Sequence, residues 1–150
     1  MKIYQKQIIA LFILTVMLFC AVAPAASETS GKLIVDISGF PNSDGFAMVA
    51  LHNSGESYKD GEATAFAKSQ VKVVDQKVQV VFTNLPYGWY GVSMFHDKNE
   101  NRQLDTNAMG IPKEAYGFSN NAKGFFGKPD YKKIKFELNS AEKQIAIKLD

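Results

Sequence analysis

Hydrophobic and polar residues alternate with a period of two along most of the chain. In the first such segment Leu33, Val35 and Ile37 fall on one face, which is the pattern of a half-buried β-strand. Clusters of turn-forming residues, such as residues 39–45, separate the segments at fairly regular spacing. About seven short strands with turns between them predict an all-β fold, an antiparallel β-sandwich. The predicted strands are residues 32–38, 46–52, 71–74, 77–82, 89–95, 134–138 and 144–149.

The connections between these strands differ in length and content. Asp75-Gln76 lies between two predicted strands, which we expect to form a hairpin. Residues 53–61 are polar and contain glycine, so we expect a loop, and residues 62–68 could form a short helical turn. The connection 97–131 is unusually long for a compact domain and contains many aromatic residues. We expect it to be ordered and packed against one end of the sandwich, because disordered segments are poorer in aromatic residues.

Residues 1–26 have the composition of a secretory signal peptide. Two lysines precede the uncharged apolar stretch 8–23, and Ala23-Pro24-Ala25 forms a small-residue cleavage site. A retained membrane anchor is the alternative, since the apolar stretch is not far short of spanning length. Cleavage would leave residues 27–150 as one periplasmic or extracellular domain without a membrane span. The chain's one cysteine, Cys20, would be removed, so the mature domain would contain no disulfide.

The charge balance argues against a nucleic-acid partner. The full chain has 17 Lys and Arg against 15 Asp and Glu, and the predicted leader contains two of the lysines and no acidic residue. The remaining domain therefore has 15 basic residues against 15 acidic residues, a net charge of about zero. Electrostatic binding to a nucleic acid needs a basic surface, so we do not expect this function.

Side-chain oxygens occupy alternate positions directly after the predicted strand 89–95. Alternate side chains of a tight loop can point toward its centre, and oxygen ligands at the first, third, fifth and ninth positions, with a backbone carbonyl at the seventh, are those of an EF-hand calcium loop. Calcium is therefore the candidate cofactor. The proposed ligands are Asp97, Asn99, Asn101, Gln103 (through its backbone carbonyl) and Asp105, with Glu114 as a carboxylate from outside the loop.

Two positions weaken the match to a calcium loop. The sixth position favours glycine because the chain turns sharply there, and this chain has Arg102. The twelfth position normally holds a bidentate glutamate, and this chain has Ala108. The alternative is a metal-free loop that Asn and Asp side chains close by hydrogen bonds to nearby backbone amides.

Two further groups of residues could have a function. His52 and His96 each lie at the end of a predicted core strand, and strands that run the same way would bring both close to Asp97, as in a small metal-dependent hydrolase. The segment 116–127 could instead present aromatic rings and amides to a glycan, a peptide or an envelope partner, or its rings could simply close the sandwich. The candidate partner-binding residues are Tyr116, Phe118, Asn120, Asn121, Phe125 and Phe126.

Several motifs follow one another in a characteristic order. They begin with Phe82-Thr-Asn-Leu-Pro-Tyr-Gly-Trp-Tyr and continue through Phe95-His96-Asp97 and the polar loop. Gly110-Ile-Pro-Lys-Glu114 and Tyr116-Gly-Phe-Ser-Asn-Asn-Ala122 follow, and the series ends with Phe126-Gly127 and Pro129. The series resembles a bacterial family of exported proteins, the domain-of-unknown-function family 2141. The resemblance implies an exported β-sandwich of the transthyretin (prealbumin-like) and carboxypeptidase-regulatory type, with no assigned activity. Members of that family usually have glycines where this chain has Glu100 and Arg102.

These observations together predict an exported binding or accessory module that is not an enzyme. Its long loop would be ordered by calcium and would present an aromatic and amide surface to a glycan, peptide or envelope partner. The alternatives are a small metal-dependent hydrolase that uses His52, His96 and Asp97, and a structural envelope protein with no ion site.

Overall fold

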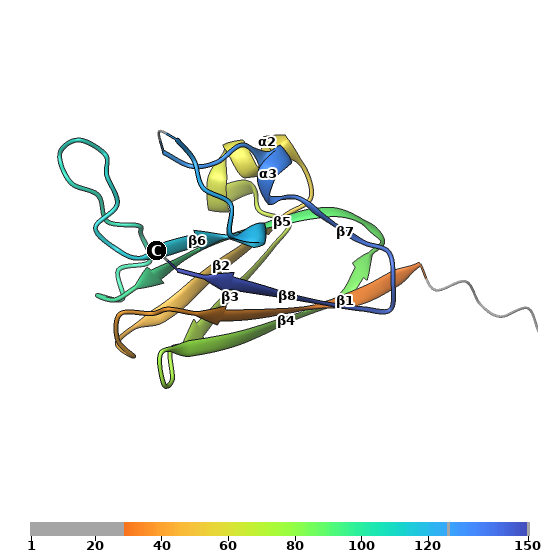
Figure 1. The fold of residues 1–150 in the computed structure, drawn as a ribbon, viewed down its shortest axis with the longest axis horizontal. Coiled ribbons are helices and arrows are strands. Elements are labelled where there is room, and N and C mark those ends of the chain that lie inside the picture. The colour runs from red at the N-terminus through yellow and green to blue at the C-terminus, as the bar shows by residue number, and fades with distance from the viewer. Residues whose placement is uncertain (1–28, 126, 150) are drawn as a thin grey trace, which may run out of the picture.

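The computed structural model describes residues 29–125 and 127–149, and the predicted leader lies outside these residues. Within the described residues, eight strands form two sheets that pack face to face (Figure 1). This arrangement confirms the predicted all-β sandwich. Among the described residues, no helix has the length and hydropathy needed to cross a membrane.

The first sheet has three strands in the order β4 (Lys77–Pro86), β1 (Ser30–Ser38) and β8 (Glu142–Lys148). Strand β1 pairs antiparallel with β4 but parallel with β8, so this sheet is mixed and not wholly antiparallel. At the centre of the sheet, Val35 lies opposite Val80 on one side and Ile145 on the other.

The second sheet has five strands. Four follow the order β3 (Ala67–Lys72), β2 (Phe46–His52), β5 (Gly88–Asp97) and β6 (Tyr116–Phe118), and all neighbours are antiparallel. Strand β7 (Phe136–Leu138) pairs with the beginning of β5 on the edge that β6 uses further along.

Ser119 fills the gap that β6 and β7 leave along the edge of β5. Its buried hydroxyl accepts the Val92 backbone N–H at 2.9 Å and donates to the Ile134 carbonyl at 2.6 Å. A side chain therefore replaces the backbone partner that a continuous strand would supply.

The core lies between the two sheets. The predicted inward face of β1 is confirmed, since Leu33, Val35 and Ile37 are at most 1% exposed. Burial of these branched apolar side chains is the main favourable term for the fold. The other buried hydrophobic residues of the core include Phe40, Val49, Leu51, Val73, Val80, Tyr90, Val92, Met94, Leu138 and Ile147.

The predicted hairpin around Asp75-Gln76 is wrong. Both residues have the positive φ angles of a tight turn, 49° and 58°, but β3 and β4 belong to different sheets. The turn contains one isolated bridge, between Val74 and Lys77, after which the chain crosses to the other sheet. Burial of Val73 in the core on one side of the turn stabilises this crossing.

Short helices and loops cover the outer face of the five-stranded sheet (Figure 1). The predicted loop 53–61 contains helix α2 (Gly55–Lys59), whose N-cap Ser54 accepts the Ser57 N–H at 3.1 Å. The 3₁₀ turn η1 (Gly61–Thr64) follows it, as expected for part of 62–68.

The long connection after β5 is also more ordered than a loop. It contains β6 and the 3₁₀ turn η2 (Ser119–Asn121), and helix α3 (Tyr131–Ile134) follows it. The connection lies along the outer face and the β6 edge of the five-stranded sheet, so it does not close one end of the sandwich as predicted. The reason is that β6 adds to the sheet in the middle of the connection.

Candidate functional site

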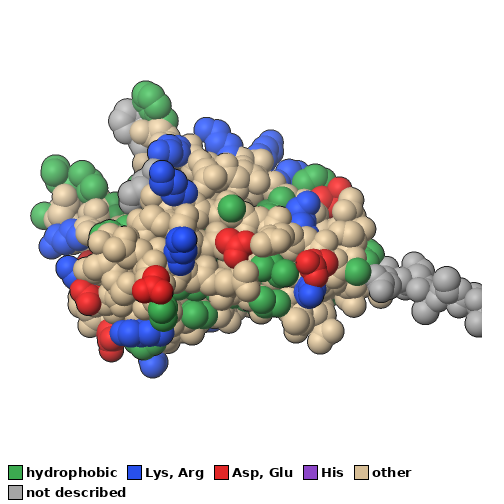
Figure 2. Space-filling view, turned by 60° about the horizontal axis from the view of Figure 1, so that its bottom comes forward, with side chains coloured by type: hydrophobic (Ala, Val, Ile, Leu, Met, Phe, Trp, Pro, Cys, Tyr) green, Lys and Arg blue, Asp and Glu red, His purple; other side chains and the backbone are tan. Residues whose placement is uncertain are grey.

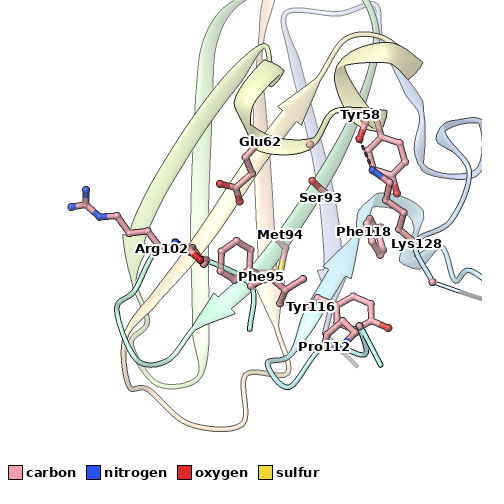
Figure 3. A pocket seen from close by; sticks show the side chains of 15 residues that line it. Tyr58, Glu62, Ser93, Met94, Phe95, Arg102, Pro112, Tyr116, Phe118 and Lys128 are labelled. Atoms are coloured by element: carbon pink, nitrogen blue, oxygen red, sulfur yellow. Dashed lines mark hydrogen bonds between the residues drawn. The ribbon is translucent and has the colours of Figure 1, made fainter. Parts of the chain in front are cut away.

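A pocket of about 610 Å³ lies on the outer face of the five-stranded sheet (Figure 3). Ser93 and Phe95 of β5 and Tyr116 and Phe118 of β6 form its floor. Alternate residues of a strand point to the same face, so Ser93 and Phe95 both point away from the core. The floor is therefore largely aromatic, with one hydroxyl group.

Two segments form the walls of the pocket. The connection after β5 contributes Leu104 and Pro112, and η1 contributes Glu62. On the remaining side stands Lys128, whose Nζ donates to the Tyr58 carbonyl at 2.8 Å and lies 4.5 Å from the centre of the Tyr58 ring. A lysine that bonds the last carbonyls of a short helix holds the wall against that helix.

Tyr58 connects α2 with the segments around it. Its hydroxyl donates to the Pro129 carbonyl at 2.9 Å. Its ring meets those of His52, Phe118 and Tyr131 at centroid distances of 5.3, 6.2 and 6.0 Å. Burial, with the nearby Asp130 carboxylate, raises the pKa of the Tyr58 hydroxyl, so it stays a neutral donor. Tyr58 therefore forms the side of the pocket next to Lys128.

His52 is wholly buried on the outer face of the five-stranded sheet, between Ser57 of α2 and Ser93 of the pocket floor. Its Nδ1 lies 3.2 Å from the Ser57 hydroxyl, which itself donates to the Thr64 carbonyl at 2.7 Å. The Ser57 hydroxyl must therefore accept from Nδ1–H, which leaves Nε2 to accept the Ser93 hydroxyl at 2.9 Å. Burial, and then the charge of Lys128, lower the pKa of His52, which keeps the ring neutral.

His96 does not share a site with His52. Strands β2 and β5 run antiparallel, so His52 lies opposite Gly91 while His96 lies opposite Ala47, at the other end of the pair. The His96 Nε2 lies 2.6 Å from the Asp44 carbonyl. The expected cluster of His52, His96 and Asp97 is not formed, because it required strands that run the same way.

The predicted cation loop folds around the buried carboxylate of Asp97. Its Oδ1 accepts the Asn101 N–H at 3.0 Å and its Oδ2 accepts the Arg102 N–H at 2.9 Å. Glu100 and Arg102 have φ angles of 63° and 62°. Glycine adopts this conformation without steric cost, which is consistent with the glycines expected at both positions in related sequences.

The other predicted ligands lie around the same loop. Asp105 accepts amide N–H groups from Asn99 at 2.8 Å and from Asn101 at 3.1 Å. Glu114 joins them from outside, since its two oxygens accept the Lys98 and Asp105 N–H groups, each at 3.0 Å. These are the self-closing hydrogen bonds that the metal-free alternative predicted.

The remaining predicted ligand, Gln103, belongs to the loop through its backbone, because its N–H donates to the Asn101 side-chain oxygen at 2.8 Å. Among the residues described, no three His, Cys, Asp or Glu side chains are gathered for a metal ion. The carboxylates of Asp97, Asp105 and Glu114 face backbone or side-chain N–H groups instead.

The predicted partner-binding residues divide into three groups. Tyr116 and Phe118 line the pocket. Asn120 donates to the Lys133 and Lys135 carbonyls, at 3.0 and 3.1 Å, and the Asn121 side-chain oxygen accepts the Lys148 N–H at 2.8 Å. These two side chains therefore hold η2 against the backbone around residues 133–135 and at Lys148. Phe125 is 90% exposed, and Phe126 lies outside the described residues.

Several residues of the pocket were not recognised in the sequence, among them Glu62, Lys128 and Ser93. Glu62 lies in a segment without clear periodicity, and Lys128 lies in a loop, so neither has a local signal. The polar Ser93 in the apolar run 89–95 was a signal, because a buried hydroxyl requires a partner.

Exposed hydrophobic side chains stand close to the pocket. Figure 2 shows such side chains at two protruding loops of the molecule. The most exposed hydrophobic residues of the connection after β5 are Met109 at 80%, Ile111 at 54% and Phe125 at 90%. Clustered apolar side chains on a protein surface often mark a site of interaction.

The family model described as an uncharacterized protein conserved in bacteria (DUF2141) matches residues 35–146. The match covers most of the chain, so the chain belongs to this family, as the ordered motifs indicated. The family description assigns no activity. No curated protein and no solved structure matches the chain.

Proposed function

We propose, for this member of an uncharacterised family, an exported binding module without catalytic activity that takes an apolar segment of an envelope peptide or protein into its pocket. The pocket itself carries the proposal, since ligand sites in proteins are concave, mostly apolar and equipped with a few polar groups. Tyr116 and Phe118 would supply the contact area, because aromatic side chains bury a large surface with few rotatable bonds.

A peptide or protein fits better than a glycan. Asn120 and Asn121, the amides that could have bonded a sugar, are already committed to backbone partners. The exposed Met109, Ile111 and Phe125 would add apolar contacts around the pocket, which a macromolecular partner can cover and a small ligand cannot.

The pocket can be filled from one side to test the proposal. Gln103 lines the pocket and is exposed, and only its backbone is used in the loop, so Gln103→Trp adds a ring there without removing a bond. Lys113→Trp is the matched control, since Lys113 is exposed on the same connection and does not line the pocket.

The probe is the peptide most enriched when a displayed random peptide library is selected on the exported protein. We expect Gln103→Trp to weaken its binding at least about tenfold and Lys113→Trp to leave it unchanged, as measured by fluorescence anisotropy. Equal affinities for both variants and the unchanged protein would show that the pocket does not bind the partner.

We further propose that calcium orders the loop beside the pocket. Arg102 adopts the positive φ angle needed at the sixth position of a calcium loop, so the chain makes this turn without the glycine expected there. Asp97, Asp105 and Glu114 all accept N–H groups of this loop, and neither ion pair found among the described residues includes any of them. Since no ion pair among the described residues balances their negative charge, these carboxylates favour the approach of a cation to the loop.

A thermal melt tests the calcium proposal. We expect millimolar calcium, and not magnesium, to raise the melting temperature above its value in EDTA, since an ion that binds only the folded state stabilises it. Asp105→Asn should remove the rise, whereas Glu100→Gln should retain it, because Glu100 faces Lys72 at 3.5 Å. A melting temperature that is the same in EDTA and in calcium would mean that the loop closes through its own hydrogen bonds alone.

Export also belongs to the proposal. It is supported by the composition of residues 1–26, which predicts a cleaved leader. Intact mass spectrometry of protein recovered from the envelope and the medium would show a chain that begins near Ala26. Recovery of the full-length chain from a membrane fraction would instead support the anchor.

A further inference from the structure

Glu62 is the one acidic side chain among the described residues that line the pocket. The short turn η1 holds it above the outer face of the five-stranded sheet. In Figure 3 its carboxylate points from η1 into the pocket, toward the side where Phe95 lies. An acidic group at the wall of an apolar pocket is costly unless a positive charge approaches it.

The cations of the described residues do not neutralise Glu62. Neither of the two ion pairs found there includes it. Lys128 is bonded to the Tyr58 and Lys59 carbonyls, and the guanidinium of Arg102 points away from the pocket in Figure 3. Burial and the nearby Asp97 carboxylate raise the pKa of Glu62, and the charge of Lys68 on β3 only partly opposes them.

The floor of the pocket also suits a cation. Phe95, Tyr116 and Phe118 line it, and the rings of Tyr116 and Phe118 meet edge to face with centroids 5.9 Å apart. The face of an aromatic ring is negative and attracts ammonium and guanidinium groups. The apolar side chains of Leu104 and Pro112 in the walls match the methylene chain that carries such a group.

We propose that the pocket binds a lysine or arginine side chain of the peptide partner, with the Glu62 carboxylate as its counter-ion. The inference rests on the proposed function and specifies its ligand: a cationic group at the end of an apolar chain. Glu62 supplies the charge, and the aromatic floor supplies the contact area.

A series of fluorescent probes that differ only in charge tests this inference. Dansylcadaverine has an aromatic body and an ammonium group at the end of a chain like that of lysine, and its N-acetyl derivative is the neutral match. We expect the ammonium probe to bind the exported protein about ten- to a hundredfold more tightly than the neutral one, which is the range for a hydrogen bond to a charged group. Dansyl-aminohexanoate, which is anionic, should bind most weakly.

Glu62→Gln should remove the preference for the ammonium probe while the neutral probe binds as before. Glu56→Gln is the matched control, since Glu56 is an exposed acidic residue of α2 outside the pocket, and it should retain the preference. Gln103→Trp should weaken both probes because it fills the pocket.

The outcomes separate this inference from the proposed function. If the neutral and ammonium probes bind equally well, and Gln103→Trp weakens both, the pocket binds ligands but Glu62 does not select a cation. If the ammonium preference persists in Glu62→Gln, another group is its source and the inference is wrong. If neither probe binds and no peptide is enriched by the selection, the proposed function fails with it.

Discussion

The outer faces of the two sheets are built in opposite ways. On the three-stranded sheet, Asp36 of β1 accepts amide N–H groups from Gln79 at 2.8 Å and Gln144 at 2.6 Å, and these polar groups remain near solvent. On the five-stranded sheet, His52 and Ser93 lie beneath α2, η1 and the connection after β5, and His52 is wholly buried.

A sandwich requires one buried face per sheet, and the three-stranded sheet has only that. The five-stranded sheet has a second buried face, and every polar group placed there needs a partner inside the protein. The serines around His52 and at the edge of β5 supply such partners. The long connections of this chain therefore cover the outer face of the five-stranded sheet only, and the pocket lies where that cover is incomplete.

The largest expected effect comes from a serine that completes the five-stranded sheet. Ser119→Ala would leave the Val92 N–H and the Ile134 carbonyl buried without their partner. Each such group costs about 1–3 kcal/mol, so we expect the free energy of unfolding to fall by about 2–6 kcal/mol, as measured by urea denaturation.

Asp36→Ala on the other sheet is the comparison for Ser119→Ala. It removes two hydrogen bonds as well, but at groups that water can reach, so we expect a loss of about 1 kcal/mol or less. Equal losses for the two variants would contradict the distinction between the two faces.

The two faces should also respond to acid in different pH ranges. Burial lowers the pKa of His52 below its ordinary value of 6.5. Just below pH 6.5, the histidine is therefore protonated in the unfolded chain and still neutral in the folded chain. Because protonation favours the unfolded chain, the free energy of unfolding should fall as the pH falls below about 6.5. Hydrogen bonds from Gln79 and Gln144 lower the pKa of Asp36 below 3.8, so its contribution is lost only at more acidic pH.

Chemical denaturation at a series of pH values measures both effects. His52→Gln should remove the decrease that begins near pH 6.5, which is the ordinary pKa of histidine, and Asp36→Asn should retain it. An unchanged decrease in His52→Gln would show that another group is protonated in that range.

The sequence predicts the sandwich well because its inward faces follow a local rule. Leu33, Val35 and Ile37 alternate, and all three are buried. The hairpin at Asp75-Gln76 fails because a turn is specified locally, whereas the sheet that the following strand joins is decided by the packing of distant residues. The parallel pairing of β1 and β8 has no local signal for the same reason.

The candidate site is less predictable than the fold. The spacing from Asp97 to Asp105 correctly indicates a loop whose side chains turn inward, because each bond is made to a neighbour in sequence. The orientation of His52 relative to His96 depends on the strand directions, and the position of Glu62 depends on how η1 packs on the sheet. The spacing of residues along the chain predicts neither the relative orientation of the two histidines nor the position of Glu62.

The loop beside the pocket offers a smaller effect of opposite sign. Arg102 has a φ angle of 62°, a conformation that costs a residue with a side chain about 1–2 kcal/mol, and glycine loses part of that gain through the greater freedom of the unfolded chain. We expect Arg102→Gly to raise the free energy of unfolding by about 0.5–1 kcal/mol in urea denaturation. Lys98→Gly, at a position without a positive φ angle, should lower it.

The smallest effect links stability to binding on the covered face. The raised pKa of Glu62 means that folding favours its protonated form, so its carboxylate costs stability above the ordinary pKa of 4.5, and the cost is complete once the pH exceeds the raised value. Glu62→Gln should therefore raise the melting temperature slightly at neutral pH, by the equivalent of about 0.5 kcal/mol or less for a partly exposed group, and leave it unchanged near pH 4. A variant that is more stable but no longer prefers the ammonium probe would identify Glu62 as a residue that serves binding at a cost to folding. A loss of stability at neutral pH would instead show that the carboxylate has a structural partner.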